Sequence, residues 1–290
     1  MEEHIYNEEK QIKYGKFSNS LKYYSLGESD KIIICLMGGP GNLIYLRDQV
    51  NNHNLLNDLI VSGYKIYFIS RKMNLSKNYT FKDQANDFIE AINQDLNGKV
   101  ECIIGYSYGG IMAYYIAEIK PEISSKYIIL GAAYRLTNKG INLDVKVAQL
   151  VSRKKYRRAL WTAYSSMPQL KKFKKKIQLL LGIILIKKSY FLNILEENGE
   201  SYHSDKLIEA ELEKNYDMTE IIKKIDIPIL LIGTTNDVYF TEEGYKETAE
   251  LLKHSKLHIV KDVGHAGLLS NKEVLNIIKE YITKECENSM

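Results

Sequence analysis

The chain alternates short apolar runs with stretches whose apolar residues recur at helical spacing. Short apolar runs bounded by turn residues are typical of buried strands, whereas helical spacing of apolar residues predicts amphipathic helices. The predicted strands span residues 31–36, 64–69, 99–104, 127–131, 227–232 and 256–260, and a hairpin is predicted from residues 12–14 and 21–25. The predicted helices span residues 45–60, 81–96, 111–119, 241–252 and 271–283. This order predicts an α/β fold whose mostly parallel central sheet carries helices on both faces.

The alternation fails in the middle of the chain, where residues 134–217 predict helices alone. We therefore expect residues 1–133 and 218–290 to form one α/β core, and residues 134–217 to form an inserted helical cap. The insertion leaves the carboxyl edge of the predicted sheet, which is the edge where ligands bind in such folds.

Charge also sets the middle segment apart. The whole chain has a formal net charge of +4, but residues 146–195 contain thirteen Lys or Arg and no Asp or Glu. In this segment lysines bracket the apolar run 177–186, and three interpretations remain open. The run packs on the core behind a solvated lysine face, or it lines an acyl pocket while lysines attract an anionic substrate, or it docks weakly on an acidic membrane surface.

The acidic residues that follow Leu195 either neutralise part of this charge or hold a substrate ammonium group. We expect no nucleic-acid partner, because the rest of the chain is net negative and carries no recognised nucleic-acid-binding motif.

The sequence disfavours secretion and insertion into a membrane. The first residues have neither a basic region nor an apolar region of a signal peptide, and the run 177–186 is too short to span a bilayer. Three cysteines do not suggest a disulfide framework. We therefore expect a cytoplasmic protein.

The strongest motif is Gly105-Tyr-Ser107-Tyr-Gly109, which lies between a predicted strand and a predicted helix. Strand, Gly-x-Ser-x-Gly and helix form a nucleophile elbow, a strained turn that presents the serine hydroxyl above the sheet edge. The pentapeptide alone is a weak signal, and the alternative is a tight turn that merely contains a serine. In this context Ser107 is the candidate nucleophile.

A serine needs a base to take its proton and a carboxylate to orient that base. In this fold they follow the serine in the order acid, then histidine, in loops after later strands. Asp237 follows the strand 227–232, and His265 follows the strand 256–260. Asp262 is the alternative acid, while a surface-loop histidine and a helix-capping aspartate are the structural alternatives for the two candidates.

An oxyanion hole needs two backbone N–H groups. One candidate is Tyr108, which follows the serine, and the other is Gly39 in the loop Met37-Gly-Gly-Pro-Gly41 after the first strand. A simple Gly/Pro turn is the alternative for that loop, and a phosphate loop is disfavoured because no Gly-Lys-Ser/Thr follows. His and Cys lack metal-ligand spacing, so no metal is predicted.

These motifs resemble those of the α/β-hydrolase superfamily, in particular serine hydrolases with a helical cap of the proline-iminopeptidase and esterase-like branch. The resemblance covers nearly all of the chain outside the cap, and it implies a Ser107–His265–Asp237 triad, no cofactor and acyl-enzyme chemistry. Two positions depart from the pattern. Met37 stands where many relatives have His, and residues 70–74 (Ser-Arg-Lys-Met-Asn) replace an Asp-x-x-Gly turn, which loosens the peptidase analogy.

The sequence thus predicts a serine hydrolase that cleaves a carboxylic ester or thioester of a small-molecule acyl substrate. Three alternatives stay open: an aminopeptidase or amidase, an acyltransferase, and a ligand-binding protein on the same fold. The sequence leaves the oligomeric state undetermined.

Overall fold

The computed structural model describes residues 12–39, 54–165, 173–186 and 199–284. One sheet of eight strands forms its centre, in the order β1-β2-β4-β3-β5-β6-β7-β8. The strands are β1 (Lys13–Lys16), β2 (Lys22–Leu26), β3 (Ile32–Leu36), β4 (Lys65–Ile69), β5 (Val100–Tyr106), β6 (Ser124–Leu130), β7 (Ile229–Thr234) and β8 (Ser255–Val260). Strand β2 pairs antiparallel with β1 on one side and with β4 on the other, and every other neighbouring pair is parallel.

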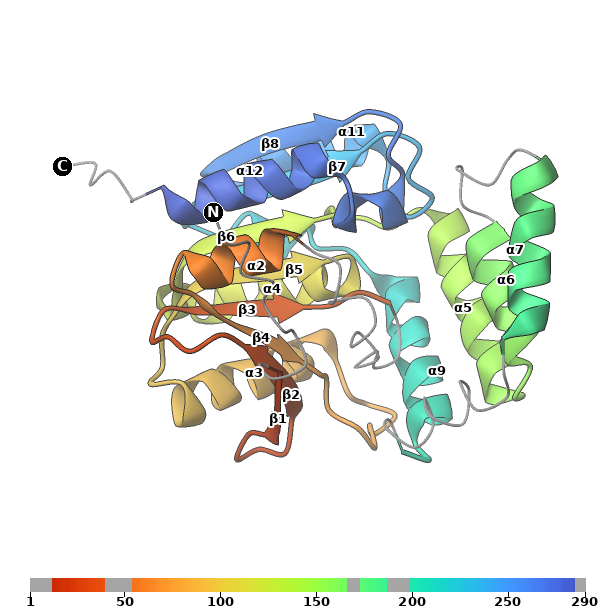
Figure 1. Ribbon diagram of the computed structural model, residues 1–290, viewed down its shortest axis with the longest axis horizontal. Coiled ribbons are helices and arrows are strands. Elements are labelled where there is room, and N and C mark those ends of the chain that lie inside the picture. Colours follow the sequence, from red (N-terminus) through yellow and green to blue (C-terminus); the bar gives the residue numbers. More distant parts are fainter. Residues whose placement is uncertain (1–11, 40–53, 166–172, 187–198, 285–290) are drawn as a thin grey trace, which may run out of the picture.

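Helices cover both faces of this sheet (Figure 1). One face carries α2 (Asn54–Val61) and α12 (Lys272–Thr283), and the other carries α3 (Phe81–Asp95), α4 (Tyr108–Ile119), α10 (Thr219–Ile222) and α11 (Glu242–Leu251). Strand β3 shows how the sequence supplies two cores, because successive side chains of a strand point to opposite faces. Ile34 and Leu36 pack with α3 and α4, whereas Ile33 and Cys35 pack with α2 and α12. The predicted fold is confirmed.

Most helices and strands begin or end within a few residues of the predicted position. The helix expected at 45–60 is described only from Asn54, and residues 45–53 of that prediction lie outside the described residues. Thr80 begins α3 with a reciprocal capping box to Asp83, which fixes that start.

The described residues between β6 and β7 are mostly helical. We call α5 (Asn138–Ser152), α6 (Tyr156–Ser165), α7 (Phe173–Leu185) and α9 (Tyr202–Leu212) the cap helices. The two segments that connect the cap helices to the core lie side by side, because Arg135 and Asp217 form a β-bridge and an ion pair of 2.7 Å.

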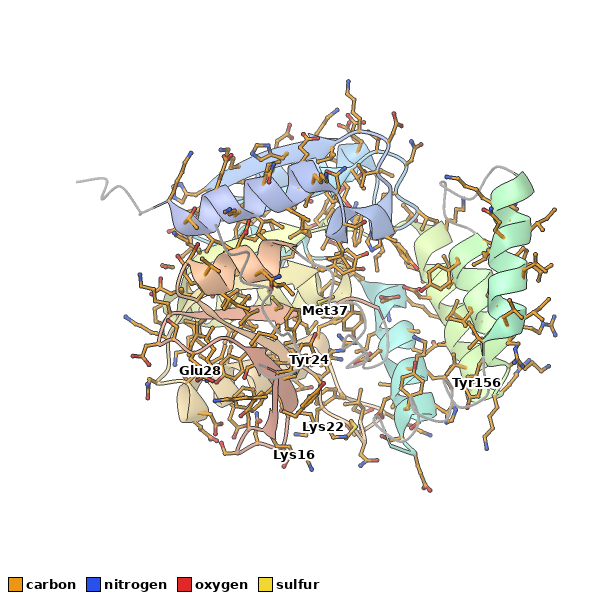
Figure 2. The ribbon with its side chains drawn as sticks, in the orientation of Figure 1. Lys16, Lys22, Tyr24, Glu28, Met37 and Tyr156 are labelled. Atoms are coloured by element: carbon orange, nitrogen blue, oxygen red, sulfur yellow. The ribbon has the colours of Figure 1, made fainter. Side chains whose placement is uncertain are left out.

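The cap helices stand beside the carboxyl ends of the parallel strands, and α9 lies between the core and the other cap helices (Figure 1). Met37, directly after β3, lies on the side of the core that faces the cap, and Tyr156, at the start of α6, lies within the cap (Figure 2). None of the helices in the described part of the chain has the length and apolar character needed to cross a membrane.

Candidate active site

Ser107 occupies the turn between β5 and α4 with a positive φ of 54° and a ψ of −119°. A non-glycine residue adopts such a conformation only where its surroundings hold it there. The flanking glycines permit the turn: a Cβ on Gly105 would lie 2.6 Å from the carbonyl oxygen of Gly109, and a Cβ on Gly109 would overlap the carbonyl of Leu36. The turn is anchored to the neighbouring strand because Ser107 N–H donates to Leu130 O at 2.8 Å.

The three residues that the sequence singled out for nucleophilic chemistry lie in one line of hydrogen bonds. His265 Nε2 lies 2.8 Å from Ser107 Oγ, and His265 Nδ1 lies 2.8 Å from Asp237 Oδ2. The Asp237 side chain is fully buried and that of His265 is 8% exposed. A neutral imidazole protonated at Nδ1 donates to the carboxylate and can accept the serine proton at Nε2.

The Asp237 carboxylate is held by donors on both oxygens. Oδ1 accepts from the backbone N–H of Tyr239 at 2.8 Å, and Oδ2 accepts from the Tyr245 hydroxyl at 2.7 Å in addition to His265. Burial and the nearby Asp237 charge raise the pKa of Tyr245 well above its usual value, so this hydroxyl remains a donor. The imidazole itself packs against the ring of Tyr239, with 4.6 Å between ring centroids. The sequence reasoning did not identify these supporting tyrosines.

The alternative acid lies elsewhere. Asp262 Oδ1 accepts from Asn236 Nδ2 at 2.8 Å in an exposed turn, whereas the carboxylate bonded to His265 is that of Asp237. The other described histidines have different surroundings: His203 bonds to Tyr156, His254 pairs with Asp226, and His258 lies in β8. His4 and His53 lie outside the described residues.

The two candidate oxyanion donors flank the serine. Tyr108 is the first residue of α4, so its N–H has no partner within the helix. The glycines after β3 come close to the elbow, because a Cβ on Gly38 would lie 2.7 Å from Ser107 Cβ. Gly39 has a φ of 75°, in the region that glycine adopts without strain.

This loop is held by a buried arginine, one of the residues 70–74 that depart from the pattern of the resembled family. Arg71, two residues after β4, donates from Nη1 to Met37 O at 2.9 Å and from Nη2 to Gly39 O at 2.7 Å. Its guanidinium thus holds the two peptide groups on either side of the one that carries the Gly39 N–H. The same group lies 4.6 Å from the ring centroid of Tyr108.

Arg71 also joins the loop to the cap. Its Nε donates to Glu209 Oε1 of α9 at 2.8 Å, and the two side chains are 5% and 2% exposed. A planar guanidinium can serve a carboxylate and two carbonyls at once, which a lysine ammonium cannot do with the same geometry. Glu209 therefore neutralises a core residue rather than the basic segment of the cap.

Two further cap carboxyls lie buried near His265. The Tyr239 hydroxyl donates to Asp144 Oδ1 of α5 at 3.0 Å, and Asp144 hydrogen-bonds with Glu213. Burial raises the pKa of Asp144, and burial together with the Asp144 carboxyl raises the pKa of Glu213 well above its usual value. Burial therefore disfavours the ionised form of each carboxyl, while the charge of the nearby Lys206 favours it. Within the described residues, no group of three or more His, Cys, Asp and Glu could hold a metal ion.

Comparisons with known proteins agree with this architecture. The esterase from Exiguobacterium antarcticum is similar in structure, with a TM-score of 0.68, 17% identity, and coverage of 93% of this chain and 99% of that one. The enol-lactonase from Burkholderia xenovorans gives a TM-score of 0.66 at 15% identity, covering 92% and 97%. The esterase RhEst1 from a Rhodococcus species gives 0.65 at 15%, covering 94% and 99%.

At these low identities the TM-scores show a shared fold alone. No curated protein sequence matches the chain. The sequence itself matches the α/β hydrolase fold family over residues 31–272, which is most of its length. The chain therefore belongs to the α/β hydrolase fold family.

Proposed function

We propose that the protein is a serine hydrolase that cleaves a carboxylic ester or thioester through an acyl-enzyme on Ser107. The observation that carries this proposal is the unbroken line from Ser107 Oγ through His265 to the buried Asp237 carboxylate, with 2.8 Å at each step. A serine in a strained turn, a base in contact with it and an oriented, fully buried carboxylate are the parts that acyl transfer requires.

Each step follows from these contacts. As Ser107 Oγ attacks the carbonyl carbon, His265 Nε2 takes the hydroxyl proton and Asp237 stabilises the imidazolium. The oxyanion accepts hydrogen bonds from the N–H groups of Gly39 and Tyr108, which Arg71 and the start of α4 hold in place. The bond to the leaving oxygen or sulfur then breaks, and His265 returns the proton to that group.

In the second half of the reaction a water molecule attacks the acyl-enzyme. His265 takes a proton from this water as it attacks, and returns the proton to Ser107 Oγ when the acid is released. If an alcohol or amine replaced the water, the same acyl-enzyme would give acyl transfer.

An apolar cavity supports an acyl substrate. A cavity of about 110 Å³ lies between the sheet and the helices α2 and α12. Its lining includes Met37 and Tyr106, the residues directly before the glycine loop and the serine. A cavity of this size and character suits a short apolar chain better than a polar one.

The buried carboxyls disfavour the aminopeptidase alternative. An aminopeptidase would need ionised carboxylates to hold the substrate ammonium group. Glu209 is already paired with Arg71, and Asp144 already has the Tyr239 hydroxyl, Glu213 and the charge of Lys206 as partners. The cap acids nearest the site therefore serve internal contacts.

The experiment that tests the proposal is hydrolysis of p-nitrophenyl esters of increasing chain length, beside acyl thioesters and aminoacyl arylamides. We expect ester or thioester turnover that Ser107→Ala lowers at least about 10³-fold. Ser125→Ala, at an exposed serine of β6, is the matched control and should keep full activity. Undiminished turnover in Ser107→Ala would contradict the site. Turnover of arylamides alone would favour the aminopeptidase, and no turnover by folded protein would favour the ligand-binding alternative.

A further inference from the structure

The helix α7 exposes an apolar surface that no other cap helix has. Five of its side chains are between 42% and 78% exposed, and we call them the α7 face: Ile177, Leu180, Leu181, Ile184 and Leu185. Their spacing of three and four residues places them along one continuous side of the helix. They are most of the large apolar side chains that stand exposed in the described part of the chain.

Among the described side chains of α7, the packed ones lie on the opposite stripe. Ile183 is 5% exposed, and the substantial contacts of α7 with the other described elements are with α6. Arg157 of α6 also donates to Ile183 O and, at 2.8 Å, to Ile186 O, which satisfies carbonyls at the carboxyl end of α7. The helix is therefore fixed to the cap by one side while its most apolar side faces outward, at the edge of the molecule farthest from the core (Figure 1).

A contiguous exposed apolar patch on a protein ordinarily marks a surface that protein or lipid covers. With thirteen residues, α7 is about 20 Å long, which is shorter than the hydrocarbon core of a bilayer. Its length therefore suits a helix that lies in the plane of a membrane interface, and does not suit one that crosses the membrane.

The surrounding charge selects among the occupants that could cover the α7 face. Lys175 and Lys176 belong to the helix, and the segment 146–195 carries a net charge of +13. A second copy of the chain would bring an equal positive charge against this one, and the two would repel. An anionic lipid surface attracts the lysines and accepts the apolar side chains between its head groups.

We propose that the α7 face docks on anionic membranes. The docked cap would direct the side of the molecule that contains Ser107 toward the lipid, since the cap lies beside that edge of the sheet (Figure 1). The proposal does not depend on hydrolysis. Ser107→Ala should bind lipid as the wild type does, so failure of the proposed activity and failure of docking are separate outcomes.

The test is flotation of the full chain with phosphatidylcholine vesicles, with and without phosphatidylserine. We expect binding to the phosphatidylserine vesicles, weakening as salt is added because the charges are screened. The double substitution Leu181→Glu and Ile184→Glu should weaken this binding at least about tenfold, because each change removes an apolar contact and adds a negative charge. Val61→Glu, at the 76% exposed Val61 of α2, is the matched control and should leave binding unchanged.

Circular dichroism and thermal melting should show that both variants remain folded, because all three positions are exposed. Three outcomes would overturn the proposal. These are wild-type protein that binds no vesicle, a double variant that binds as well as the wild type, and equal binding to vesicles without phosphatidylserine. Light scattering tests whether a second copy of the chain covers the α7 face instead. A dimer that the double substitution abolishes would assign the α7 face to a second copy.

Discussion

The helices α4 and α7 are both rich in apolar residues, but their surroundings are opposite. Between Ile111 and Ala117 of α4, six side chains are at most 1% exposed. Among the described side chains of α7, Ile183 alone is buried. The helix α4 begins at the serine elbow, and it packs between the central strands and α3. The helix α7 belongs to the insertion, and its substantial contacts with the other described elements are with α6. Apolar composition alone therefore does not decide whether a helix is buried. The place of the helix in the fold decides whether other parts of the protein cover its apolar side chains.

The two regions differ in the same way in their charges. At the elbow each charged group has a partner: Asp237 has His265 and Tyr245, and Arg71 has Glu209. Around α7 the lysines create an excess of positive charge, because the segment 146–195 contains no acidic residue. We therefore expect changes at the elbow to affect turnover and folding, and changes on α7 to affect association.

The largest effect should come from the smallest chemical change at the elbow. Asp237→Asn keeps the size of the side chain but presents an amide to His265 Nδ1, so the imidazole loses its orienting charge. We expect kcat to fall on the order of 10⁴-fold with the fold retained. Asp262→Asn is the matched control and should keep wild-type turnover; the reverse result would make Asp262 the acid. Steady-state ester hydrolysis measures both.

Arg71→Gln should give the next largest effect, because it leaves Glu209 buried without its cation. We expect a loss of about 3–5 kcal/mol in the free energy of unfolding, together with a lower kcat. The double variant Arg71→Met, Glu209→Leu separates the two roles, since it removes the uncompensated charge without restoring the bonds to Met37 O and Gly39 O. Urea unfolding should show stability recovered while kcat stays low. Recovery of both would mean that Arg71 does not position the loop.

A pair of truncations compares the two helices directly. Met112→Ala in α4 removes a fully buried side chain, and we expect it to cost about 2–5 kcal/mol of unfolding free energy. Leu181→Ala removes a side chain that is 54% exposed on α7, and we expect a change within about 0.5 kcal/mol. Denaturant unfolding checks both values. A comparable loss at Leu181 would show that α7 is covered within the protein itself.

The sequence predicted much of this arrangement because its signals are local. Buried strands leave apolar runs, and the elbow leaves a pentapeptide at a strand–helix boundary, so the fold and the placement of Ser107 follow from short segments. His265 and Asp237 could be selected because they follow predicted strands whose carboxyl ends share one edge.

The remaining features depend on pairs that the sequence keeps far apart. Arg71 and Glu209 are 138 positions apart, and each resembles an ordinary surface charge in its own segment. The raised pKa values of Asp144 and Glu213 likewise depend on burial that no local pattern reports. For α7 the sequence left three interpretations open, and one of them, packing of its Ile and Leu on the core, does not describe the five exposed side chains.

The central claim is that Ser107 is an activated nucleophile, and labelling with a fluorophosphonate probe tests it most directly. The probe reacts with a serine whose proton can be taken by a neighbouring base, whether or not the natural substrate is known. We expect a single adduct, mapped by peptide mass spectrometry to Ser107, that is lost in His265→Ala. Well-folded wild-type protein that takes up no probe, or an adduct on another residue, would contradict the account.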